Sequence, residues 1–242
     1  MSTSAGSPPA EADLPRDLRG YGLIAAPLER CLHALAGAEI GTRSVLRLKE
    51  DASPEAAAAY LSHLTWPATR LALFAVDGWT AVLTNRRHGS DFEDHQDHFG
   101  RLCQARAIRV VDHPARFAVA AGRRVRQAYE ARMFVLHDEA GANLRSVFCV
   151  DDGGHWDFGA YGGERLPVEA GFEYEARRIR DRFTHENLLA LQASIGVGTP
   201  VREAFAKAER VALVAEELRD AIWDAQVEAK RLVAEARRWQ SG

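Results

Sequence analysis

The chain has 242 residues, 47% of them hydrophobic and 27% charged, which suits one sizeable hydrophobic core with an appendage. Its formal net charge is −3, which argues against nucleic acid as a partner. No apolar run approaches about 18 residues, so we expect no membrane span and a cytoplasmic location. The basic residues are nearly all arginines and alanine is abundant, which favours a GC-rich bacterial genome as the source.

The N-terminal region and the cysteines set further bounds. Residues 1–18 are rich in Ser, Pro, Ala and Gly and cannot bury enough apolar surface to fold, so we predict a disordered tail. The three widely spaced cysteines form no CxxC pair, and their odd number argues against a disulfide framework. We therefore expect buried free thiols at Cys31, Cys103 and Cys149.

The first half of the chain predicts helices alternating with strands. Apolar residues at helical spacing predict helices over 26–37 and 92–105, and alternation predicts strands over 43–49 and 107–112. Ser53 as N-cap and Pro54 after it predict a further helix over 53–64. Asp77 and Gly78 lie between two apolar runs, and this pair predicts a type I′ β-hairpin because both positions need a positive φ.

The next region predicts three consecutive antiparallel strands. Strand-like runs between residues 128 and 161 are joined by the turn sequences DEAGAN and DDGG, which indicates a β-meander. A helix is expected over 172–196, broken or capped again at Thr184, where Asn187 gives a partial capping box. The predicted fold class is α+β, with a mainly antiparallel sheet and packed helices in a globular domain over 19–196.

Residues 197–242 are predicted to form a long C-terminal helix or a helix pair. No glycine and no further proline follow Pro200 as far as Gln240, and apolar or small residues repeat every 3.5 positions, as in a coiled coil. The alternative is two shorter helices with a break near Glu216. The seam would bind another protein or form a homodimer through its large residues, which are Val211, Leu218, Ile222, Leu232 and Trp239.

Acidic residues and a histidine gather at the second turn of the meander. Asp151, Asp152 and His155 are candidate catalytic residues, acting as metal ligands or as a base with its orienting partner. Hairpin geometry alone also explains the DDGG sequence, because aspartate and glycine are favoured turn residues. The motif contains neither a nucleophile nor a recognised metal spacing.

A second candidate lies on the helix expected over 92–105. His95 and His98 are three residues apart, and Asp91 and Asp94 precede them by four, so each imidazole has a carboxylate that could orient it for a metal. A solvated helix face with local His–Asp contacts is the alternative.

Arginine density is the third candidate. Arg123, Arg124 and Arg126 lie close together and could bind an acidic partner surface. Four further arginines lie between 177 and 182, in the helix expected over 172–196. Acidic residues flank both clusters, so intramolecular ion pairing on a solvated face is the alternative.

Two functions follow. The chain lacks GxGxxG, GxxxxGK[ST], GxSxG and HExxH. The first function is therefore a non-enzymatic protein-interaction module, of immunity or adaptor type, with no cofactor. The second is a metal-dependent or acid–base hydrolase with a site near Asp151, Asp152, His155, His95 and His98.

Overall fold

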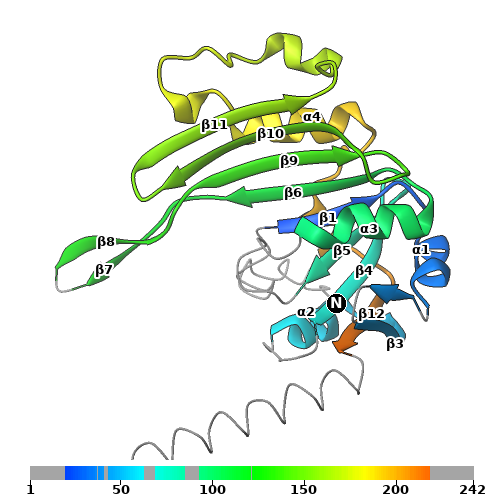
Figure 1. Ribbon diagram of the computed structural model, residues 1–242. Coiled ribbons are helices and arrows are strands. Elements are labelled where there is room, and N and C mark those ends of the chain that lie inside the picture. Colours follow the sequence, from blue (N-terminus) through cyan, green and yellow to red (C-terminus); the bar gives the residue numbers. More distant parts are fainter. Residues whose placement is uncertain are drawn as a thin grey trace, which may run out of the picture.

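The computed structural model describes residues 20–36, 38–40, 43–62, 69–84, 93–120 and 122–218. The protein is a mixed helix and sheet structure built on one large antiparallel sheet, as the sequence predicted (Figure 1). The ten strands of the sheet are β1 (Gly20–Ile24), β2 (Glu39–Ile40), β3 (Arg43–Ala52), β4 (Thr69–Val76), β5 (Trp79–Thr84), β6 (Ala107–His113), β9 (Ala131–His137), β10 (Asn143–Asp152), β11 (His155–Gly162) and β12 (Val211–Leu218). Their order is β11-β10-β9-β6-β1-β5-β4-β12-β3-β2.

Helices cover both faces of the central part of the sheet. The helices are α1 (Leu28–Leu35), α2 (Pro54–Ser62), α3 (Glu93–Cys103), α4 (His185–Ser194) and α5 (Val201–Ala206), with 3₁₀ turns η2 (Pro167–Gly171) and η3 (Ile179–Asp181). Alternation along β4 places Leu73 on the side of α1 and α3, and Phe74 on the side of α2, α4 and α5. Phe99 is buried in the core on the side of α1 and α3, and Phe205 is buried in the core on the side of α2, α4 and α5.

The hairpin predicted at Asp77 and Gly78 is confirmed. The two residues join β4 to β5 with φ values of 48° and 80°, as a type I′ turn requires. The carboxylate of Asp77 also accepts hydrogen bonds from the backbone N–H of Thr199 at 2.6 Å and from its hydroxyl at 2.9 Å. The turn therefore fixes the loop that enters α5.

The helix predicted over 172–196 is correct only in its second part. Thr184 begins α4 as N-cap, and its hydroxyl accepts from the backbone N–H of Asn187, so the capping box is confirmed. Residues 172–183 form no α-helix and contain only the short turn η3. Tyr174 and Phe183 are buried on the sheet, and the tertiary contacts of these side chains hold an irregular path in this segment.

The long helix predicted from residue 199 is wrong for the described part of that segment. Only the short helix α5 forms, and β12 then enters the sheet between β4 and β3, with Val211 and Ala215 buried. Neither the continuous helix nor the helix pair broken near Glu216 fits this strand. The side chain of Leu218 and the other seam residues (Ile222, Leu232 and Trp239) lie outside the described residues.

Residues 211–215 form a strand because all five are apolar and this part of the sheet is covered on both faces. Such a run fits a central strand as well as a helical seam, and periodicity alone does not separate the two. Arg210 fastens the start of the strand through ion pairs with Glu29, Glu50 and Asp51.

Candidate interaction site

A two-stranded arm projects from the sheet and carries the arginine cluster. Among the described residues, strands β7 (Arg116–Ala120) and β8 (Arg123–Ala128) pair only with each other, and they leave the sheet between β6 and β9 (Figure 1). Gly122, with φ 73°, supplies the positive φ of the turn. We call residues 116–128 the arm. The sequence predicted no strands there, although it singled out three of its arginines.

The arm exposes apolar side chains to an unusual degree. The described residues include seven large apolar side chains that are exposed, and four of these lie on the arm or at its base: Phe117, Val119, Val125 and Tyr129. Val119 is 79% exposed and Tyr129 is 50% exposed. Apolar groups gathered on one projection, with arginines between them, are typical of a binding surface.

Strand register sorts the arm into two faces. Phe117 lies directly opposite Arg126, and Val119 opposite Arg124, so these four side chains share one face. The guanidinium carbon of Arg124 lies 3.8 Å from the centre of the Phe117 ring, and that of Arg126 lies 5.4 Å from it. Each cation–π contact contributes about 0.5–1 kcal/mol at an exposed site and orients a planar donor group.

The charge of the arm is opposite to that of the rest of the chain. Its arginines (Arg116, Arg123, Arg124 and Arg126) give it +4, with no acidic residue. Because the whole chain carries −3, the residues outside the arm carry −7. Five residues of β7 extend about 17 Å, roughly twice the Debye length of about 8 Å at physiological ionic strength. The tip is therefore largely screened from the acidic body.

The base of the arm meets the acidic turn of the meander. Asp151 is buried, and its carboxylate accepts from Arg126 at 2.5 Å and from the backbone N–H of Gly154 at 2.6 Å. Asp152 and His155 are exposed and lie opposite each other in the β10–β11 pairing. Their side chains are on the face of the sheet opposite to that of Asp151. Among the three candidate catalytic residues, Asp151 is thus committed to holding the turn and the arm.

The two candidate hydrolase groups lie far apart. His98 lies on α3, where its Nδ1 is 3.5 Å from Nη2 of Arg101. A Cβ placed on Gly141 would lie 3.1 Å from the side chain of Arg101, so this end of α3 lies beside the β9–β10 turn. The turn at Asp151 is at the other end of β10, whose ten residues extend about 33 Å. The structure therefore does not bring the groups to one site.

Other parts of the histidine hypothesis stay untested. The described part of the structure does not include the side chain of His95. It also does not include residues 85–92, among them Asp91. Nε2 of His98 is buried and makes no hydrogen bond to described residues. Within the described ranges, no three His, Cys, Asp or Glu side chains cluster as a metal ion would require.

A histidine and an aspartate meet at a site that the sequence did not indicate. His185, in the first turn of α4, places its Nδ1 2.8 Å from Oδ2 of Asp112 on β6. A pocket of about 270 Å³ beside them is lined by Glu130, Arg132, Arg180, Asp181, Thr184, His185 and Glu186. Residues 73 positions apart form this pair, so no local spacing could have revealed it. Its lining mixes three carboxylates with two arginines and shows no preference for a ligand charge.

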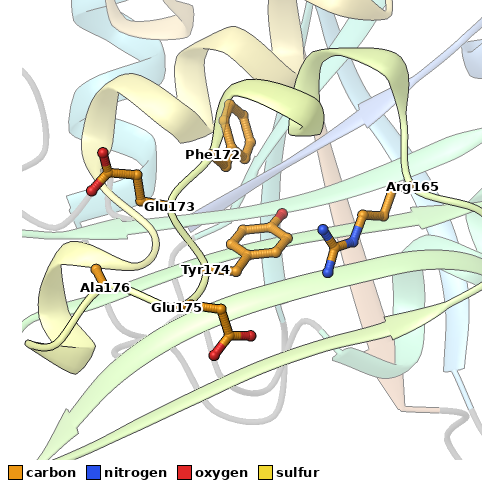
Figure 2. Close-up of a pocket in the computed structure, with 6 residues that line it drawn as sticks. All are labelled: Arg165, Phe172, Glu173, Tyr174, Glu175 and Ala176. Carbon is orange, nitrogen blue, oxygen red and sulfur yellow. The ribbon is translucent and has the colours of Figure 1, made fainter.

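A second hollow, of about 350 Å³, lies over the segment that follows β11. Figure 2 shows Tyr174 in its middle, between Phe172 and Arg165, with Glu173 and Glu175 directed away. The guanidinium carbon of Arg165 lies 5.1 Å from the centre of the Tyr174 ring.

Beneath this hollow, a buried ion pair fixes the segment to the sheet. Glu169 is fully buried and accepts from Nε of Arg145 at 2.9 Å, and from the Tyr174 hydroxyl at 2.7 Å. Burial raises the pKa of the Glu169 carboxyl, but the hydrogen bonds from Arg145 and Tyr174 outweigh it and hold this pKa below its usual range. Burial and the charge of Glu169 raise the pKa of Tyr174. The arrangement is a structural clamp without an open site.

The cysteines are buried free thiols, as predicted. Burial raises the pKa of the Cys149 thiol to about 11, so it is protonated at neutral pH and is a poor nucleophile.

Comparison with known proteins identifies no relative: no family model, curated protein or solved structure matches this chain. None of the helices in the described ranges has the length and apolar character needed to cross a membrane.

Proposed function

We propose that this chain is a non-enzymatic protein-interaction module, of immunity or adaptor type, and that the arm is its binding element. The observation that carries the proposal is the gathering of exposed apolar side chains and arginines on one projection. Aromatic residues and arginine supply most of the energy of protein interfaces, because they combine large contact area with oriented donors.

The contacts at the base of the arm support the same proposal. The ion pair of Arg126 with buried Asp151 and the backbone bond from Asp151 to the carbonyl of Glu130 fix the base of the arm. A rigid base lowers the ordering cost of binding, because less freedom is lost when a partner docks.

The alternative of a metal-dependent or acid–base hydrolase has less support. Its candidate residues lie at two ends of β10, and Asp151 has an evident structural role. The pair formed by His185 and Asp112 has the geometry of an oriented base, but the hydroxyl of Thr184, which lines the same pocket, is hydrogen-bonded to Asn187 in the N-cap of α4.

Photo-cross-linking tests the proposal. A photoreactive phenylalanine analogue at Val119 should give a cross-linked product in extract of the native host, and the product should disappear when Arg124→Glu is added. The matched control carries the analogue at Glu139, an exposed residue of the β9–β10 turn. Identical products from both positions, or no product from Val119, would refute the arm as a binding element.

A further inference from the structure

One face of strands β9, β10 and β11 has no helix over it among the described residues (Figure 1). Helices α1 and α3 lie on this side of the sheet, but they pack on β1, β4, β5 and β6. Strand register places the following side chains on this surface, which we call the open face: Met133, Val135, Phe148, Val150, Asp157 and Tyr161. The other side of the same strands is covered, and Phe134, Val147 and Cys149 are buried there.

The open face carries two neighbouring aromatic rings, tilted by 44° to each other. Tyr161 is 60% exposed, and its ring centre lies 5.8 Å from that of Phe148. A Cβ on Gly159 would meet the side chain of Tyr161 at 2.5 Å and that of Phe148 at 2.7 Å. The glycine therefore leaves room for Tyr161 to lie across the strand beside Phe148. A partly exposed apolar surface of this kind is typical of a site that another protein covers.

The open face and the arm are complementary in charge. Asp152 and Asp157 are exposed at the end of the open face that lies nearest the β10–β11 turn. The arm carries +4 with Arg124 and Arg126 beside Phe117 and Val119 on one face, whereas the rest of the chain carries −7. Apolar side chains on the arm can thus meet apolar side chains on the open face, and Arg124 can meet the two aspartates while Arg126 stays paired with Asp151.

The two surfaces are also neighbours in one molecule. The arm leaves the sheet from β6 and β9, and the pair formed by Arg126 and Asp151 holds its base against the β10–β11 turn. A two-fold axis near this base would lay each arm along the open face of the other copy, so that both contacts form twice. The arm, at about 17 Å, is shorter than β11, at about 26 Å, and fits within the face.

We propose that the arm of one copy binds the open face of a second copy in an isologous dimer. This inference rests on the proposed function, in which the arm is a binding element, and names a second copy of this chain as the occupant of the open face.

Sedimentation equilibrium of the full chain tests the proposal. The wild type should be a dimer at micromolar concentration, and Arg124→Glu or Asp157→Arg should each weaken the dimer about tenfold or more, because like charges then face each other. The double variant carrying both changes should recover most of the affinity. The matched control is Arg177→Glu, which reverses an exposed arginine outside both surfaces and should leave the dimer unchanged. Circular dichroism should show the same fold for all variants.

Three results would overturn the inference. These are a monomeric wild type, a dimer that neither single variant weakens, and a double variant no tighter than the singles. A monomeric wild type that still gives an arm-dependent cross-link from Val119 to another protein would refute the dimer and leave the proposed function standing. A cross-link from Val119 to a second copy of this chain would support both.

Discussion

Replacing Glu169 by glutamine should destabilise the protein by about 3–5 kcal/mol, because it leaves the charge of Arg145 buried without its partner. The carboxylate is fully buried, and Arg145 reaches it through Nε at 2.9 Å and Nη2 at 2.5 Å. The Arg145 side chain is 5% exposed and cannot turn to solvent in the folded state. The hydroxyl of Tyr174 loses an ionised acceptor at the same time.

The substitution should also change how stability depends on pH. The pKa of Glu169 is lower in the folded protein than in the unfolded chain, where a glutamate has a pKa of about 4.3. A depressed pKa contributes stability that is present above the unfolded value and is lost as the pH falls through the folded value. The wild type should therefore lose stability below about pH 4.3. Glu169→Gln should not show this loss, because it has no carboxyl group to protonate at this position.

Urea unfolding at pH 7 and at pH 4, followed by circular dichroism, measures both effects. Glu173→Gln is the matched control, because this exposed glutamate lies in the same segment and should change stability by no more than about 0.5 kcal/mol. Replacing Arg145 and Glu169 together by methionine should cost less than Glu169→Gln, since no unpaired charge remains. If Glu169→Gln had the same midpoint urea concentration as the wild type, and the same dependence of unfolding free energy on urea concentration, the ion pair would not be a stabilising clamp.

Three further outcomes follow from local geometry. Gly78→Val should cost about 1–3 kcal/mol because a β-branched residue resists the positive φ of 80°. Gly198→Val is the matched control, because an added Cβ meets no atom within 4 Å at either glycine but Gly198 lies outside the left-handed φ region. This variant should be nearly neutral in the same denaturation assay. Gly159→Ala should displace the exposed ring of Tyr161, and thermal unfolding should show a loss of no more than about 1 kcal/mol. Cys149 should resist alkylation at pH 8 in the native state and react only after unfolding, which mass spectrometry can follow.

Part of the candidate site could be predicted from the sequence. The density of arginines drew attention to Arg123, Arg124 and Arg126, and the expected pairing with acidic residues is seen for Arg126. Strands β7 and β8 were missed because both of their faces are exposed. A strand without a buried face lacks the alternation of apolar and polar residues on which the prediction depends. The missing signal was the absence of acidic residues between 116 and 128, with a glycine turn in the middle.

The features that could be predicted correctly from residue type are those whose energetics are local. The turn at Asp77 and Gly78, the cap at Thr184 and the start of α2 at Ser53 each depend on the φ preference or the hydrogen bonds of a few neighbouring residues. These contacts form wherever the segment lies, so residue type was enough to predict them.

Residues 211–218, in contrast, form a strand because of their tertiary contacts. Their apolar run satisfies a helical seam and a buried strand equally well, and propensity differs between the two by a small amount per residue. The edges of β3 and β4 supply two ladders of backbone hydrogen bonds, and the two cores bury both faces of the strand. The ladder partners lie more than 130 positions away in sequence, and no pattern within the segment can encode their contribution.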